Sequence, residues 1–406
     1  MKSRTIPLGA LTAGLMAPAL LSAAELADPA AIERFLESEV AARNLPGLVA
    51  LVTDEDEVIY VSAHGQRNVA GGLPMTTDTI FRIASMTKPI AAAAIMMLVE
   101  EGRLSLDAPI GDYVEEYADA RVITGPVGAD GSFSTRPAAQ PITIRHLLSH
   151  SSGLAYGFAS DTVTALNAAG VNGADVPLLY DPGEAWSYAG GIAIVGRVLE
   201  EIEGIGLDEF LGQRLFEPLG MTDTSFAVPT VKNERVTTTH GRDDTGALIE
   251  NPNADEIRSA PSGDGGLNST AGDYSRFIQL ILNDGVAPDG QRLLRPESVA
   301  ELGRNQLGDV RVSLQDEPNP ALARAFPLGA GRDGFGLGFQ VTGAHEDPDV
   351  RTPGSMSWAG IFNTEFWIDP ASGIGAVLLM QYLPFYDADA IELLQAFEAR
   401  IYSELR

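Results

Sequence analysis

Ser85 and Lys88 are the residues of this chain whose types and spacing most directly indicate chemistry. The segment Ser85-Met86-Thr87-Lys88 holds one of only three lysines in 406 residues. A helix-like run over residues 89–100 follows, and Gly102 is a common helix-ending residue. Ser85 is therefore predicted at a helix start, with Lys88 one turn later on the same face. In that arrangement a lysine can activate a serine without any histidine.

A phenol, Tyr188, is the second candidate group. A serine hydroxyl is a poor nucleophile until a base removes its proton. A lysine amine can do so once burial or nearby positive charge lowers its pKa, and a phenol beside an ammonium can share the role. Tyr188 follows the turn residues Pro182-Gly183 and precedes a helical run over residues 192–202. Taken alone, a tyrosine at this place would more often be a core aromatic residue with a hydrogen-bonded hydroxyl.

The elements that must position these groups fall into a clear order along the chain. Strand-like segments lie near both ends, and helical patterns with Gly- and Pro-rich loops lie between them. The expected elements are a helix over 29–43, a hairpin over 47–52 and 58–61, a strand over 335–341, paired strands over 362–368 and 374–381, and a closing helix over 387–406.

This order predicts an α/β (α+β) fold of two lobes. An antiparallel sheet flanked by helices is expected from the two ends of the chain, with a helical lobe inserted between them. The sheet lobe is placed at about residues 25–80 and 295–406, and the helical lobe at about 81–294. Residues 25–406 are treated as one domain.

Charge and composition exclude several functions. The chain has 27 basic and 55 acidic residues and a net charge of −28. A field of that sign repels nucleic acid and anionic membranes, so neither is expected as a partner. The absence of cysteine excludes disulfides, thiolate catalysis and cysteine-based zinc sites. No apolar run after residue 24 is long and charge-free enough to span a bilayer.

The N-terminus predicts export. Lys2 and Arg4 precede an apolar stretch over residues 6–21, and Ser22-Ala23-Ala24 follows. A basic start, a short apolar core and small residues before the cut are typical of a cleavable secretory signal. We therefore expect a signal peptide over residues 1–24, cleavage near Ala24 and a periplasmic or secreted protein. A retained apolar N-terminal helix is the alternative.

Two further patterns are interpreted as structural. Gly329-x-Gly331-x-x-Gly334 matches a dinucleotide-binding fingerprint, but an alternating strand pattern follows it where a helix should begin. His146 and His150 have i, i+4 spacing, but the glutamate of a zinc-protease motif is missing after the first histidine. No metal and no cofactor is expected.

The motifs together resemble those of the serine β-lactamases and penicillin-binding proteins. These proteins share the order seen here, an S-x-x-K motif, a tyrosine after a Pro-Gly turn, and a small-residue motif before a late strand, which in this chain is Trp358-Ala359-Gly360. The likeness extends from about residue 28 to 403. Within this superfamily the chain most resembles the class C branch and its esterase relatives, the family VIII carboxylesterases.

Two departures from the lactamase pattern favour an esterase. Tyr188-Ala189-Gly190 stands where lactamases have Y-x-N, so the amide that contacts a substrate carbonyl is missing. Trp358-Ala359-Gly360 stands where lactamases have K-T-G or H-x-G. Lys or His there would pair with a substrate carboxylate, whereas the bulk of Trp favours a neutral, apolar partner. The family VIII esterases have W-x-G at this place.

The resemblance implies a role for each of these residues. Ser85 would be the nucleophile, and Lys88 and Tyr188 would form the base pair, with the principal base left open. The backbone N–H groups of Ser85 and Ile361 would form the oxyanion hole. The substrate pocket would include Trp358, Ala359 and Gly360.

The implied activity is hydrolysis of short-chain or otherwise small carboxylic esters through an acyl-enzyme, with a small-molecule ester as the partner. A class C-like β-lactamase or a D-amino-acid peptidase is the alternative within the superfamily. A non-catalytic binding protein that keeps the fold is the alternative from another class. The oligomeric state does not follow from the sequence.

Overall fold

A computed structural model describes residues 24–243, 245–251, 260–315 and 319–406. The predicted signal peptide falls almost entirely on residues 1–23 and lies outside the described residues. Within the described part of the chain, no helix has the length and apolar character needed to cross a membrane.

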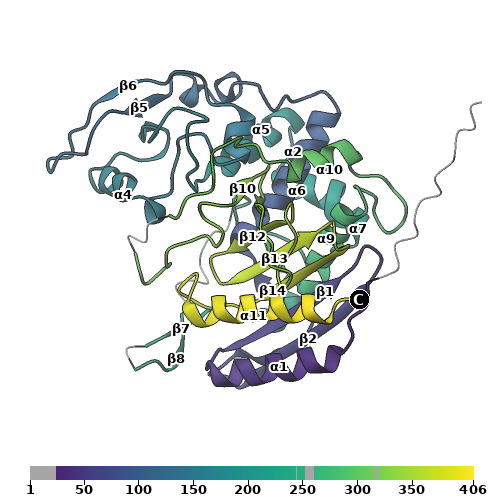
Figure 1. Cartoon of the computed structure of the whole chain (residues 1–406). Helices are drawn as coiled ribbons and strands as arrows, with labels where there is room; N and C mark the ends of the chain where they lie inside the picture. The colour runs from purple at the N-terminus through teal and green to yellow at the C-terminus, as the bar shows by residue number, and fades with distance from the viewer. Residues whose placement is uncertain (1–23, 244, 252–259, 316–318) are drawn as a thin grey trace, which may run out of the picture.

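An eight-stranded sheet forms the centre of the described molecule. Its strands lie in the order β10-β11-β12-β13-β14-β1-β2-β3, so strands from the two ends of the chain make one sheet (Figure 1). The pairs within it are antiparallel, including β1 with β14, where the two ends meet. The strands are β1 (Gly47–Thr53), β2 (Val58–Asn68), β3 (Leu73–Pro74), β10 (Gly334–Phe335), β11 (Gln340–Val341), β12 (Met356–Gly360), β13 (Thr364–Asp369) and β14 (Ile374–Leu379).

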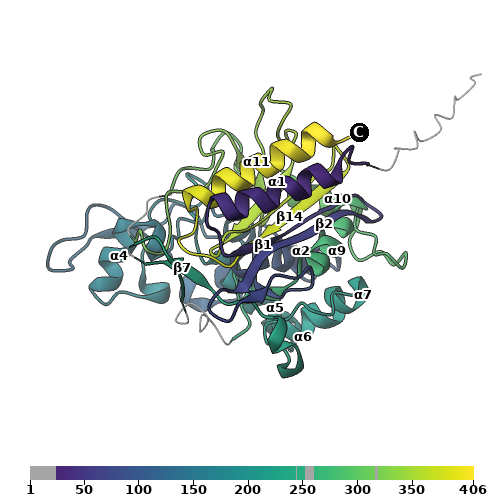
Figure 2. The same ribbon diagram turned by 90° about the horizontal axis from the view of Figure 1, so that it is seen from below.

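Helices cover both faces of this sheet. On one face α1 (Pro29–Ala42) and α11 (Ala388–Glu404) lie side by side across the strands (Figure 2). On the other face lie α2 (Thr87–Glu100) and α9 (Ala271–Leu282). Every residue of β1 is buried, since successive side chains point to opposite faces and both faces are covered. The two faces therefore give two separate apolar clusters, with Val49 in one and Ala50 in the other.

The chain between β3 and β10 contains the remaining helices and short strand pairs. In Figure 1 most of these helices are drawn above the central sheet, whereas β7 and β8 are drawn at the lower left. The helices are α3 (Ile144–Leu148), α4 (Asp161–Ala168), α5 (Gly191–Glu203), α6 (Leu207–Leu211), α7 (Glu217–Leu219) and α10 (Pro296–Gly303). The strands are β4 (Phe81–Arg82), β5 (Arg121–Ile123), β6 (Thr135–Pro137), β7 (His240–Arg242), β8 (Leu248–Glu250) and β9 (Asn268–Ser269).

The predicted α/β fold with a helix-flanked antiparallel sheet is confirmed. The predicted hairpin is confirmed as β1–β2, and the late strand pair as β13–β14. The prediction of one strand over residues 335–341 is wrong, because β10 and β11 are separate strands that pair with each other. The chain reverses between them at Gly338, which has a φ of +81° and donates its N–H to the carbonyl of Leu148. Glycine adopts this conformation without steric cost.

Candidate active site

Ser85 lies in a single 3₁₀ turn (Ala84–Met86) directly before α2. The predicted helix start is therefore displaced by two residues, since α2 itself begins at Thr87. The turn closes through a 3.0 Å hydrogen bond from the N–H of Met86 to the carbonyl of Ile83. Ala84 has a φ of +45°, a left-handed conformation that is uncommon for a residue with a side chain. Strained backbone of this kind concentrates at functional sites.

Lys88 lies in the first turn of α2 and has no exposed surface. Its Nζ donates to the Oγ of Ser85 at 3.2 Å and to the backbone carbonyl of Asp264 at 2.6 Å. The carbonyl contact satisfies a donor that would be costly to bury unpaired. It also holds the amine beside the serine oxygen, within the distance at which a proton can pass between them.

Tyr188 packs its ring against the same amine. The Nζ of Lys88 lies 4.8 Å from the ring centroid, a cation–π distance. The backbone of Tyr188 is fixed on two sides, because its N–H donates to the Oε1 of Gln315 at 3.1 Å and its carbonyl accepts from the N–H of Tyr156 at 3.0 Å. Among the described residues, its buried hydroxyl has no hydrogen-bond partner. That hydroxyl is therefore available to a reacting group.

Replacing Tyr188 with phenylalanine is expected to separate activity from stability. If the phenol helps to move the serine proton, kcat for an ester substrate should fall about 10²- to 10³-fold. Stability should hardly change, since the hydroxyl has no hydrogen bond to lose within the described chain. The Tm should shift by less than about 2 °C. Steady-state kinetics and thermal unfolding monitored by circular dichroism check both parts, and full activity in this variant would remove Tyr188 from the mechanism.

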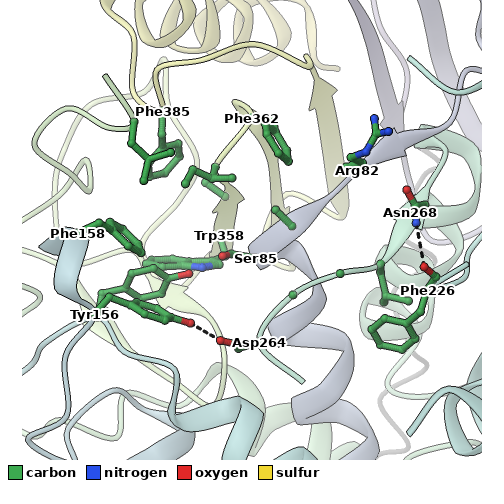
Figure 3. A pocket seen from close by; sticks show the side chains of 18 of the residues that line it. Arg82, Ser85, Tyr156, Phe158, Phe226, Asp264, Asn268, Trp358, Phe362 and Phe385 are labelled. Carbon is green, nitrogen blue, oxygen red and sulfur yellow. Dashed lines mark hydrogen bonds between the residues drawn. The ribbon is translucent and has the colours of Figure 1, made fainter. Parts of the chain in front are cut away.

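Tyr156 and Asp264 are site residues that the motif analysis did not identify. The hydroxyl of Tyr156 donates to the Oδ2 of Asp264 at 2.5 Å, drawn as a dashed line in Figure 3. The Oγ of Ser262 donates to the other carboxylate oxygen at 2.6 Å. These bonds fix the residue whose carbonyl accepts from Lys88. Neither residue belongs to a motif identified in the sequence, so only the packing of the fold reveals them.

His150 is a buried neighbour of the site. Its ring centroid lies 4.9 Å from that of Tyr188 and 5.1 Å from that of Phe335. Burial, and then the charge of Lys88, hold the pKa of His150 well below its usual value, so the imidazole is neutral. His146 instead caps α3, where its Nδ1 accepts from the N–H of Thr143. Within the described residues, no group of three or more His, Asp or Glu side chains could hold a metal ion.

A cavity of about 640 Å³ opens above Ser85. Figure 3 shows aromatic side chains from several separate segments around it. Its apolar wall is formed mainly by Phe158, Phe226, Val228, Val236, Leu322, Phe362 and Phe385. Arg82 also lines the cavity, but its guanidinium points away from Ser85 and donates to the carbonyl of Thr237 at 2.9 Å (Figure 3).

The Trp358-Ala359-Gly360 segment forms the end of strand β12, beside the serine turn. Trp358, Ala359 and Ile361 line the cavity, whereas Gly360 is not among its lining residues. A Cβ at Gly360 would lie 2.4 Å from the carbonyl of Ile83, so glycine is needed for the strand to approach the serine turn this closely. Ile361 lies in the turn directly after β12.

The structure thus brings together the predicted site residues from three distant parts of the chain. Lys88 contacts Ser85 directly, Tyr188 packs on Lys88, and Trp358 packs on Tyr188 with 5.0 Å between ring centroids. A hydroxyl next to a buried amine, at the floor of an apolar cavity, can perform nucleophilic acyl transfer.

The chain is similar to known proteins along most of its length. The family model described as Beta-lactamase matches residues 32–399. Lovastatin esterase of Penicillium rubens is 31% identical, with 88% of this chain and 94% of that protein covered. Esterase EstB of Burkholderia gladioli is 28% identical, with 91% and 94% covered. Monacolin J acid methylbutanoyltransferase of Aspergillus terreus is 27% identical, with 95% and 98% covered.

The solved structures include simvastatin synthase (LovD) from Aspergillus terreus in a mutant form. It has a TM-score of 0.80 and 26% sequence identity, and 95% of this chain and 98% of that chain are covered. The structural and sequence relatives therefore include both esterases and acyltransferases. Since the family model covers most of the chain, the protein belongs to the Beta-lactamase family.

Proposed function

We propose that the protein is a serine hydrolase that cleaves short-chain or otherwise small carboxylic esters through an acyl-enzyme. The observation that carries this proposal is the 3.2 Å contact between the buried Nζ of Lys88 and the Oγ of Ser85, at the floor of an apolar cavity. A buried amine in that position is suited to take the serine proton. The esterases among the relatives support the same reaction class.

The proposed reaction has two halves. The Oγ of Ser85 attacks the ester carbonyl carbon while its proton passes to Lys88, directly or with the phenol of Tyr188. The carbonyl oxygen becomes an oxyanion, for which we propose the backbone N–H groups of Ser85 and Ile361 as donors. The tetrahedral intermediate collapses, the alcohol leaves with a proton from the same base pair, and water then releases the acid by the reverse sequence of proton transfers.

The cavity wall supports a neutral substrate. By its resemblance to the lactamase motif, Trp358 stands where lactamases have a Lys or His that would pair with a substrate carboxylate. Here Trp358 is packed among aromatic rings. The guanidinium of Arg82 is directed away from Ser85 (Figure 3). A carboxylate beside the scissile bond would therefore lose water without gaining a charged partner, which is unfavourable.

A substrate panel tests this function against the lactamase and peptidase alternatives. We expect kcat/KM for p-nitrophenyl acetate and butyrate to exceed that for a cephalosporin or a D-Ala-D-Ala peptide by at least about 100-fold, roughly 2.7 kcal/mol of transition-state binding. The comparison uses one enzyme preparation at a single pH. Turnover of the cephalosporin or the peptide that equals ester turnover would contradict the esterase assignment.

Acyl transfer to an alcohol is a second candidate function, favoured by the size of the cavity. A volume of about 640 Å³ is large for a short acyl chain and lies in the range of drug-sized ligands. A bulky apolar alcohol in it could replace water in the second half of the reaction, giving a new ester and free Ser85. Chromatography of products formed from p-nitrophenyl butyrate with and without cyclohexanol separates the two outcomes. Butyrate alone would exclude transfer to this acceptor.

A further inference from the structure

A second cavity lies behind strand β12, on the side of the sheet that α11 covers. Its volume is about 380 Å³, and Trp358, Ala359 and Phe385 line both this cavity and the one above Ser85. Leu394 and Gln395 of α11 line its other side. We refer to it as the rear cavity. Nothing in the proposed ester hydrolysis uses it.

Glu365 is the unusual residue of the rear cavity. It lies on β13, paired in register with Ala359 of β12 on one side and Leu378 of β14 on the other. Its side chain lines the cavity, and the residue is only 7% exposed. Its Oε1 has no hydrogen-bond partner among the described residues. A buried carboxyl oxygen without a partner costs free energy, so it marks a place where a donor would bind favourably.

The basic residues around the rear cavity already have partners. Arg351 donates through its Nε and Nη2 to the two carboxylate oxygens of Glu398, at 2.6 and 2.8 Å. Arg332 donates through its Nε to Asp333 at 2.6 Å. With both guanidinium groups neutralised, Glu365 presents an acceptor that no lining cation satisfies. The net charge of −28 further favours a cation over an anion near this surface.

The apolar part of the lining limits the ligand to an organic one. Leu328, Val350, Phe385 and Leu394 line the rear cavity together with the polar residues. A volume of about 380 Å³ is at the lower end for small-molecule sites. It exceeds what a single ion fills, and no group of three or more His, Asp or Glu side chains in the described chain is placed to hold a metal.

We propose that the rear cavity binds a small organic ammonium ion, whose N–H groups donate to Glu365 while its apolar part contacts Leu328, Phe385 and Leu394. The paired charges of Arg351 and Glu398 stay in place and form the polar side of the site. Because β12 lines both cavities, the ligand would lie directly behind the wall that carries Trp358.

Protonation of Glu365 supports this assignment. Burial raises the pKa of its carboxyl well above the ordinary value of 4.5, although the charge of Arg351 opposes the effect. The other charged or titratable groups that line the cavity are Glu398 on α11, Tyr386 before that helix, Arg332 and Asp333 before β10, and His345 and Asp347 between β11 and β12. An ammonium ion would convert the acid to a carboxylate, so binding should release a proton and strengthen as the pH rises toward that pKa.

Three probes of matched shape and different charge test the proposal. Isothermal titration calorimetry of the full chain with benzylamine, benzyl alcohol and benzoate at one pH compares a cation, a neutral isostere and an anion. Benzylamine, protonated at neutral pH, is expected to bind at least tenfold more tightly than the other two. Equal affinity for benzyl alcohol, or preferred binding of benzoate, would overturn the proposal.

Amino-acid substitutions test whether benzylamine binds in the rear cavity. Glu365→Gln should weaken benzylamine binding at least tenfold, and Gln395→Trp, which adds bulk from the exposed side of α11, should weaken it without touching the carboxyl. Asp264→Asn is the matched control, since it removes the acid of the cavity above Ser85. Unchanged binding in Glu365→Gln, or loss of binding in Asp264→Asn alone, would refute the assignment. Neither result depends on ester hydrolysis.

The Glu365→Gln variant also gives a prediction for how the stability of the folded chain depends on pH. In the folded chain Glu365 keeps its proton above 4.5, where the unfolded chain loses it. The stability that this carboxyl contributes is thus fully present below 4.5 and declines as the pH rises toward the folded pKa. Glu365→Gln, which cannot ionise, should become more stable relative to the natural chain as the pH increases from 4.5 to 8. Urea unfolding at several pH values measures this difference, and a constant difference would contradict it.

Discussion

Replacing Ser85 with alanine is expected to lower kcat/KM for p-nitrophenyl butyrate by roughly 10⁴-fold or more. The variant has no oxygen to form the acyl-enzyme, whereas the cavity and the adjacent Lys88 remain. The residual rate should come only from binding and from donors near the carbonyl. The measurement is release of p-nitrophenol under conditions where the uncatalysed rate has been subtracted.

The fold should tolerate this change. Among the described residues, the side chain of Ser85 has one hydrogen bond, the 3.2 Å bond from Lys88, and the lysine keeps its shorter bond to the carbonyl of Asp264. Ser225→Ala is a suitable control, because within the described part of the chain the hydroxyl of Ser225 donates to one group, the nearby carbonyl of Ala227. That control should retain full activity. If the activity of Ser85→Ala stayed within tenfold of that of the natural chain, another residue would have to be the nucleophile.

Replacing Lys88 with methionine should have the second largest effect, a loss of about 10³-fold or more in kcat. Methionine fills a similar volume but can neither accept the serine proton nor return it to the leaving alcohol. The variant should also be less stable, since the carbonyl of Asp264 loses its 2.6 Å donor inside the protein. Kinetics and thermal unfolding measured on the same sample separate loss of activity from loss of folded protein.

Lys232→Met provides the matched control for the lysine. Lys232 is partly exposed and pairs with Asp223 at 2.8 Å, far along the chain from the serine turn. A surface ion pair of this kind contributes at most about 1 kcal/mol. The control should therefore keep its activity, and a Lys88→Met protein that is folded and fully active would exclude the lysine as the base.

The local elements of the fold were predictable because their signals are local. The apolar runs of β1 and β14 and the amphipathic pattern of α11 determine both the type and the position of each element. The hairpin of β10 and β11 was not predicted. The alternating residues over 335–341 satisfy a strand pattern, whereas the reversal depends on a bond from Gly338 to Leu148, almost two hundred residues earlier.

The residues of the candidate site also differ in how far the sequence alone predicts them. Ser85 and Lys88 are three residues apart, so helical spacing alone could place them together. Tyr188 and Trp358 were identified by resemblance to family motifs, and their contact with each other depends on the packing of distant segments. Asp264 acts through its backbone carbonyl, which no residue type reveals, and Gln315 holds Tyr188 from a loop 127 residues away. Glu365 looks in the sequence like an ordinary polar residue of a strand.

Covalent labelling of the full chain with a fluorophosphonate, followed by peptide mass mapping, tests the central claim most directly. We predict one adduct, on the peptide that contains Ser85, with no adduct in Ser85→Ala and much slower labelling in Lys88→Met. This pattern would show a serine made nucleophilic by its neighbouring lysine. An adduct at another residue, or no adduct on a folded natural chain, would contradict the account and favour a binding protein that keeps the fold without the reaction.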